Sequence, residues 1–150
     1  MERLTTCVPL RLDFAGGTLD IWPLHLALAE PAVTVNVALD LPAEVQVAPL
    51  DGDGIRLASR DLGGEAHYAD PAALRAALSS GSCPLPLLGH AALLAAPEGG
   101  YALETSARSP KGAGLGGSSA LLVAVIGALT AARGARQDLR TIQRMAQDVE

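Results

Sequence analysis

The stretch SPKGAGLGGSSA, residues 109–120, joins a strand-like segment at 101–107 to a long apolar segment that is typical of a buried helix. Its glycines have no Cβ, so they can adopt positive φ and bring backbone N–H groups close to a ligand. The helix expected to begin near Ser118 adds N–H groups that point out of its first turn and the positive end of its dipole. Because this combination binds anions, the sequence predicts a phosphate site here.

Other glycine-loop chemistries fit this stretch less well. Its glycines match the dinucleotide fingerprint G-x-G-x-x-G at Gly112, Gly114 and Gly117. That fingerprint opens a βαβ unit with an acidic residue roughly 20 positions further on, whereas residues 137–150 have the pattern of a helix. A Walker A loop needs a lysine after its glycines, and Lys111 precedes them. A serine hydrolase elbow needs a histidine after its serine, and no histidine follows His90.

A second glycine loop lies near the N-terminus. The alternating, β-branched residues 4–12 predict a strand, which FAGGT at 14–18 is expected to end. Asp20 follows this turn, and its carboxylate could accept hydrogen bonds from two sugar hydroxyls or cap a short helix.

Arg11 lies near the end of this first strand. Its fork of donors suits a phosphate or a carboxylate. The alternative is a surface ion pair with Asp13 or Glu2, which would contribute little to stability.

Both glycine loops resemble motifs of one family, the GHMP kinases, which phosphorylate small molecules. Pro110 and the run GLGGSSA at 114–120 are similar to its phosphate-binding motif P-x-x-x-G-L-G-S-S-A-A, with Gly117 in place of the first serine. Residues 9–20 align without gaps to its first motif, and are most similar to the heptose-phosphate kinase form R-I-S-F-A-G-G-G-T-D. The resemblance implies an α+β fold like ribosomal protein S5 domain 2, with a mixed or antiparallel sheet packed against helices. We expect residues 1–150 to form one such N-terminal domain.

The resemblance also implies the roles of individual residues. Arg11 would lie beside the transferred phosphoryl group, and Ser118 and Glu150 would hold Mg²⁺, although Glu150 also fits an ordinary solvated glutamate. The expected ATP-binding residues are Pro110, Lys111, Gly112, Ala113, Gly114, Leu115, Gly116, Gly117, Ser118 and Ser119. The expected substrate-binding residues are Gly16, Gly17, Thr18 and Asp20. Gly17 stands where galactokinase-like members carry a sugar-binding glutamate, which disfavours galactose as the substrate.

The implied reaction is transfer of the γ-phosphoryl group of ATP, with Mg²⁺, to a hydroxyl of a small molecule such as a sugar or sugar phosphate. In the family a G-x-x-D-Q segment and a third glycine-rich motif follow, so we expect this chain to correspond to the N-terminal half of such a kinase. Its expected partner is a C-terminal half or a second copy. A non-catalytic nucleotide-binding or regulatory module and a nicotinamide-binding domain remain as alternatives.

Composition limits the other classes of function. A chain of 150 residues that is 49% hydrophobic can bury one core. Its net charge of −5 and its 3% aromatic content argue against nucleic acid and against an anionic membrane as partners. Cys7 and Cys83 lack the spacing of a metal or disulfide framework, and the N-terminus lacks the apolar core of a signal peptide, so a cytoplasmic protein is expected.

The remaining segments are predicted from their periodicity. Strands are expected at 33–39, 44–48, 54–58 and 101–107, with DGDG at 51–54 joining the second and third as a hairpin. Helices are expected at 71–78, 85–96 and 137–150. The apolar stripe of the last helix is Leu139, Ile142, Met145, Ala146 and Val149.

Overall fold

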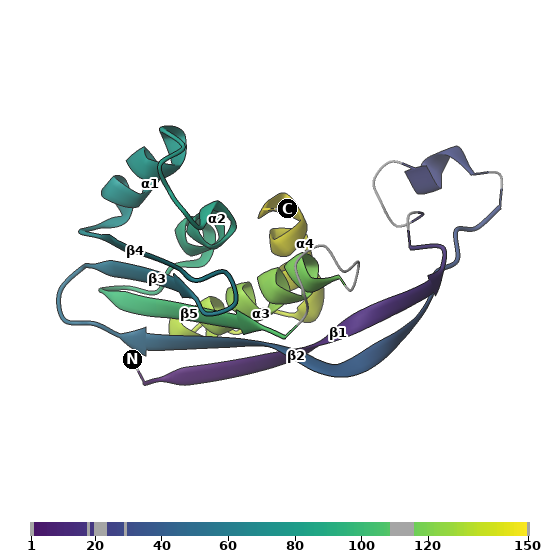
Figure 1. Cartoon of the computed structure of the whole chain (residues 1–150), viewed down its shortest axis with the longest axis horizontal. Helices are drawn as coiled ribbons and strands as arrows, with labels where there is room; N and C mark the ends of the chain where they lie inside the picture. Colours follow the sequence, from purple (N-terminus) through teal and green to yellow (C-terminus); the bar gives the residue numbers. More distant parts are fainter. Residues whose placement is uncertain (1, 18, 20–23, 29, 109–115, 150) are drawn as a thin grey trace.

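The computed structural model describes residues 2–17, 19, 24–28, 30–108 and 116–149, and describes Leu24 and His25 by their backbone alone. The strands are β1 Leu4–Ala15, β2 Val35–Pro49, β3 Ile55–Ser59, β4 Gly64–Tyr68 and β5 Tyr101–Ala107. The helices are the short 3₁₀ helix η1 Leu24–Ala27 and the α-helices α1 Pro71–Ser79, α2 Pro86–Ala95, α3 Gly117–Ala132 and α4 Leu139–Val149. The strands form one sheet in the order β1-β2-β5-β3-β4 (Figure 1). Only β3 and β5 pair in parallel among these neighbours, so the predicted α+β class with a mixed sheet is confirmed.

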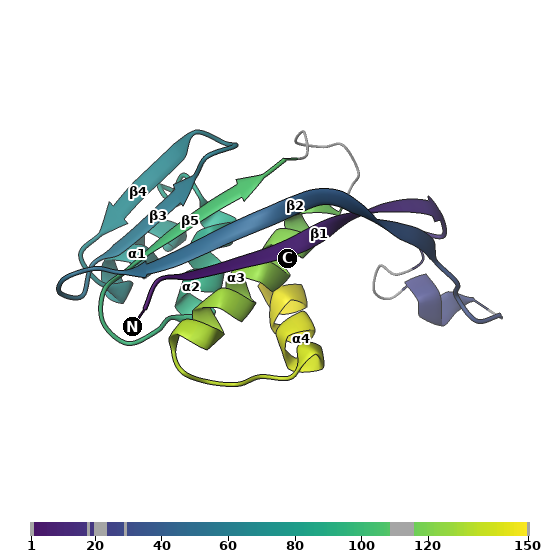
Figure 2. The same cartoon turned by 90° about the horizontal axis from the view of Figure 1, so that it is seen from below.

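The α-helices α1, α2, α3 and α4 cover one face of the sheet (Figure 2). Alternate residues of β2 and β5, such as Val45, Val47 and Leu103, are fully buried and join helix residues in one core. α3 lies centrally in this core and contacts β1, β2, α2 and α4. The long apolar segment after the glycine stretch thus forms a buried helix over Gly117–Ala132, as predicted. Within the part of the chain that is described, no helix is both long and apolar enough to cross a membrane.

Elements with strong local signals form where they were predicted. α1 begins at Pro71, which needs no N–H partner in a first turn, and the Asp70 side chain accepts a hydrogen bond from Ala73 N at 2.8 Å. α2 and β5 also match their predictions, as does α4. In α4, however, Leu139 is 76% exposed, so the buried stripe begins only at Ile142.

The predicted hairpin between 44–48 and 54–58 is wrong, because β5 lies between β2 and β3. Residues 51–54 do form a turn, but its backbone is bonded to the start of β5. Gly100 N donates to Gly52 O at 2.6 Å, and Tyr101 N donates to Gly54 O at 2.9 Å. The turn therefore delivers β3 to the far side of β5.

β1 and β2 form a long two-stranded arm that reaches beyond the rest of the sheet (Figure 1). The predicted strands 33–39 and 44–48 join into the single strand β2, which begins two residues later than predicted, at Val35. A register shift next to the Pro9–Pro42 pair carries this strand past Pro42. A bulge of this kind accommodates a residue that cannot donate to the ladder. β1 also runs on to Ala15, three residues beyond its predicted end at Leu12, because Ala15 pairs with Val35.

The strand β4 was not predicted. Its sequence GEAHY has little apolar character, and its residues are exposed or half-buried at the edge of the sheet. It pairs with β3 throughout its length, and Arg56 Nε donates to Glu65 Oε1 at 2.7 Å across the pair.

Candidate functional site

Arg11 on β1 lies next to Gly116, the residue that precedes α3. Gly116 is the N-cap of α3 and has a φ of 62°, in the left-handed region that favours glycine. A Cβ at Gly116 would lie 3.3 Å from Cγ and 3.5 Å from Nε of Arg11. The missing side chain of Gly116 therefore lets the Arg11 side chain lie against the first turn of α3.

The first glycine loop is a turn fixed by its own backbone. Leu19 N donates to Gly16 O at 2.8 Å, and Thr34 Oγ1 donates to the same oxygen at 3.1 Å. A Cβ at Gly16 would collide with the carbonyl oxygen of Val33, and Gly16 has a φ of 76°. Only glycine fits this position without a shift of the neighbouring backbone.

Arg11 forms the ion pair with Asp13 that the sequence left as one of its alternatives. Arg11 Nε lies 3.3 Å from Asp13 Oδ1, with the Arg11 side chain 45% exposed and that of Asp13 21% exposed. A guanidinium carries five N–H groups, and the pair with Asp13 engages it through Nε. The ion pair and a phosphate contact are therefore compatible.

Ser118 and Ser119 lie exposed in the first turn of α3. The N-cap of this helix is Gly116, which has no side chain to bond to the first turn. No acidic residue occurs in that turn, so no carboxylate there would repel an anion. These features suit an anion at the beginning of α3.

Several predicted site residues lie outside the described residues. These are Thr18 and Asp20 of the first loop, Pro110, Lys111, Gly112, Ala113, Gly114 and Leu115 of the phosphate stretch, and the candidate metal ligand Glu150. Their assigned roles stay predictions.

The sequence reasoning missed one carboxylate near these loops, Asp61, and considered the other, Asp13, only as an ion-pair partner of Arg11. Asp13 lies between Arg11 and the first glycine loop. Asp61, in the β3–β4 turn, accepts hydrogen bonds from Ala107 N at 3.1 Å and from Ser59 Oγ at 3.2 Å. It thereby fixes the end of β5, one residue before Arg108 and the stretch 109–115. For Asp13 the signal was present in the sequence, since alternation on a strand places Arg11 and Asp13 on one face.

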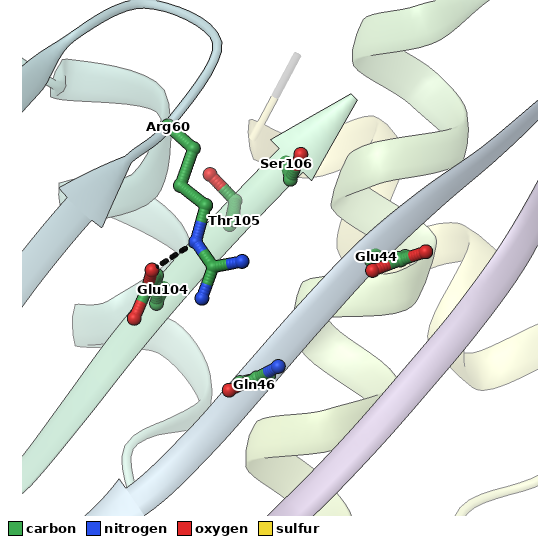
Figure 3. A pocket seen from close by; sticks show the side chains of 6 residues that line it. All are labelled: Glu44, Gln46, Arg60, Glu104, Thr105 and Ser106. Atoms are coloured by element: carbon green, nitrogen blue, oxygen red, sulfur yellow. Dashed lines mark hydrogen bonds and ion pairs between the residues drawn. The ribbon is translucent and has the colours of Figure 1, made fainter. Parts of the chain in front are cut away.

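A small hollow on the open face of the sheet is a separate feature (Figure 3). It is lined by Glu44, Gln46, Arg60, Glu104, Thr105 and Ser106. Arg60 Nε forms an ion pair with Glu104, and this hydrogen-bonded carboxylate raises the pKa of Arg60. Two glutamates around one paired arginine do not suit a phosphate. Among the described residues, no three His, Cys, Asp or Glu side chains are grouped to hold a metal ion.

The helix α3 is followed by α4 and not by a strand. The βαβ unit that a dinucleotide fingerprint requires is therefore not formed by the described residues after this glycine stretch.

Comparisons with known proteins agree with this architecture. Residues 86–150 match the family described as GHMP kinases N terminal domain. The bifunctional fucokinase/GDP-fucose pyrophosphorylase of Arabidopsis thaliana is 30% identical over 134 residues, which cover 83% of this chain and 12% of that protein.

Solved structures share the fold over nearly the whole chain. The mevalonate kinase of Methanococcus jannaschii superposes with a TM-score of 0.80 at 15% identity, over 99% of this chain and 46% of that one. A D-glycero-D-manno-heptose 1-phosphate kinase from Bacteriodes thetaiotaomicron superposes with a TM-score of 0.74 at 20% identity, over 97% and 47%. The chain thus spans less than half the length of these kinases and about an eighth of the plant relative. Residues 86–150 thus match the N-terminal domain family of the GHMP kinases, and the chain as a whole has the fold of that domain.

Proposed function

We propose that this chain is the ATP-binding part of a small-molecule kinase and that it binds ATP with Mg²⁺ at the beginning of α3. The observation that carries the proposal is the contact between Arg11 and Gly116, because it brings a cation from the first motif to the end of the phosphate stretch. The exposed serines and the absence of acidic residues in the first turn of α3 support an anion at the same place.

In this proposal each group acts by positioning and by charge. Phosphoryl transfer needs little covalent chemistry from the protein, and catalysis depends on alignment and on neutralising negative charge. Backbone N–H groups of residues 110–119 and the Ser118 hydroxyl would bind the phosphates, and Arg11 would stabilise the charge that develops on the transferred group. Ser118 and Glu150 are the candidate ligands for Mg²⁺, which when bound neutralises phosphate charge.

The acceptor in this proposal is a sugar or a sugar phosphate. Support comes from the plant relative, whose name includes fucokinase. Asp20 would accept hydrogen bonds from acceptor hydroxyls, and Gly16, Gly17 and Thr18 would form the turn beside them. Because Gly17 cannot supply a carboxylate, galactose is not the proposed acceptor.

We further propose that the chain works with a C-terminal kinase half or with a second copy of itself, in the cytoplasm. Support comes from the kinases of similar fold, which are about twice as long as this chain. The isolated chain is therefore expected to bind nucleotide but to catalyse little phosphoryl transfer.

Calorimetric titration of the chain with ATP–Mg²⁺ and with NAD, side by side, tests the proposal. We expect saturable binding of ATP–Mg²⁺ that weakens when Mg²⁺ is omitted, and no comparable binding of NAD. Preference for NAD, or binding of neither ligand, would contradict the kinase assignment. A second assay, sugar phosphorylation by the chain mixed with a C-terminal half, separates an enzyme from a non-catalytic nucleotide-binding module.

A further inference from the structure

Asp13 is placed to act on Arg11. The two residues are two positions apart on β1, so their side chains leave the strand on the same face. Arg11 Nε lies 3.3 Å from Asp13 Oδ1. This oxygen is buried and accepts no hydrogen bond within the described part of the chain. The nearby positive charge of Arg11 is therefore its main compensation.

The other side of the Asp13 carboxylate packs on Gly17. A Cβ at Gly17 would lie 2.9 Å from Oδ2 and 3.0 Å from Cβ of Asp13. Any side chain at residue 17 would therefore displace the carboxylate, which has Arg11 beside it. Arg11 in turn lies against Gly116, so Gly17, Asp13, Arg11 and Gly116 form a continuous line of contacts between the two glycine loops.

We propose that Asp13 is a positioning residue that holds the Arg11 side chain at the beginning of α3, and that Gly17 is required because it leaves room for the Asp13 carboxylate. The proposal rests on the role of Arg11 in the proposed function and deepens it. It gives Gly17 a physical role of its own, which is independent of the substrate that the kinase accepts.

Two opposite effects of Asp13 on a bound phosphate can be distinguished. The negative charge of Asp13 repels a phosphate. The same carboxylate already restricts the Arg11 side chain, so Arg11 loses less conformational entropy when a phosphate binds. If repulsion dominated, removal of the carboxylate would strengthen ATP–Mg²⁺ binding. We expect positioning to dominate, because Arg11 is partly exposed and a free arginine samples many rotamers.

A double-mutant cycle on ATP–Mg²⁺ affinity tests this assignment. We expect Arg11→Ala to weaken binding on the order of tenfold, as loss of a charge-assisted hydrogen bond does. Asp13→Ala should weaken it about fivefold in the wild-type background and less than twofold in the Arg11→Ala background, because Asp13 acts through Arg11. Asp13→Asn keeps the shape of the side chain but removes its charge, so it should weaken binding nearly as much as Asp13→Ala, because the pair is held by charge. Gly17→Ala should reproduce the effect of Asp13→Ala.

The matched control is Glu65→Ala, which removes the carboxylate partner of Arg56 from an exposed pair on β3 and β4 and should leave ATP–Mg²⁺ affinity unchanged. A readout without nucleotide is the NMR signal of the Arg11 Nε–H group, whose order parameter should fall in Asp13→Ala and Gly17→Ala.

Equal or tighter binding by Asp13→Ala, or additive effects of the two substitutions, would overturn the positioning role while leaving ATP binding by the wild-type chain intact. An unchanged Arg11 order parameter would overturn it as well. If the wild-type chain bound no ATP–Mg²⁺, the proposed function would fail, and the catalytic purpose of this positioning would fail with it.

Discussion

The side chain of Arg11 lies against the backbone of Gly116, where a Cβ would stand 3.3 Å from its Cγ. One residue belongs to the arm formed by β1 and β2, and the other begins the buried helix α3. The positive charge of Arg11 thereby lies at the positive end of the α3 dipole. An anion bound there would interact favourably with both Arg11 and the N-terminus of α3. This relationship connects the fold to the proposed kinase function.

Replacement of Gly116 by alanine tests whether this contact matters. Gly116→Ala places a methyl group against Arg11 and forces a non-glycine residue to a φ of 62°. We expect ATP–Mg²⁺ binding to weaken at least tenfold and the free energy of unfolding to fall by about 1–2 kcal/mol. Gly134→Ala is the control, because Gly134 has a φ of 75° but, apart from its two chain neighbours, no described residue lies within 4 Å of the new methyl group. Gly134→Ala should lose about as much stability as Gly116→Ala and keep the wild-type affinity for ATP–Mg²⁺. Equal affinity of the two variants for ATP–Mg²⁺ would argue against the contact.

Ser118→Ala tests the serine assigned to the phosphates. Ser118 is exposed in the first turn of α3 and does not cap the helix. The variant should therefore bind ATP–Mg²⁺ more weakly while its melting temperature stays close to that of the wild type. Calorimetry and thermal melting measure the two quantities, and unchanged affinity would remove the role given to this hydroxyl.

The approach of Gly100 to the 51–54 turn should be essential for stability. A Cβ at Gly100 would lie 2.7 Å from Gly52 O and 3.0 Å from Gly54 O, and both are backbone atoms that cannot move independently. Gly100→Ala should lower the free energy of unfolding by more than ~2 kcal/mol, because it disturbs two hydrogen bonds that start β5.

Gly127→Ala is the matched control for that substitution. Gly127 lies inside α3, and, apart from the nearby backbone of that helix, no described atom lies within 4 Å of its new methyl group. Alanine there should raise the free energy of unfolding by about 0.5–1 kcal/mol, through lower chain entropy in the unfolded state. Urea unfolding of both variants distinguishes the two effects, and similar values for both would contradict the close packing at Gly100.

Stability should decline in alkaline solution, partly through Tyr101. Burial raises the pKa of Tyr101 above its ordinary value near 10, and burial likewise raises the pKa of Tyr68 to about 12. Because the folded state disfavours the phenolate, full stability is present below pH ~10 and is lost as the pH rises above that value. Tyr101→Phe should flatten the decline measured by urea unfolding between pH ~9 and ~11, at the cost of a weak 3.5 Å hydrogen bond to Ala92 O. A decline as steep as that of the wild type would show that other groups cause it.

Local signals in the sequence predicted much of this fold, and long-range pairing was where they failed. Pro71, the glycine run before α3 and the alternation of 101–107 each act within a few residues, so α1, α3 and β5 were predicted correctly. The insertion of β5 between β2 and β3 depends on contacts between residues far apart in the chain, and the DGDG turn gives no sign of it.

The candidate site shows the same division. The residues of both glycine loops were recognisable from their motifs, but their proximity was not, since nothing in the spacing of Arg11 and Gly116 indicates that they touch. Asp13 was considered only as a surface partner of Arg11, because its packing on Gly17 depends on the path of the turn after β1.

The most direct test of the account is an NMR titration of the ¹⁵N-labelled chain with ATP–Mg²⁺. We predict that the largest shifts occur at the backbone amides of Gly116, Gly117 and Ser118 and at the side-chain Nε–H of Arg11, with Arg60 in the hollow on the open sheet face unchanged. Shifts confined to the hollow around Arg60 and Glu104, or no shift at Arg11 and Gly116 at saturating nucleotide, would contradict it.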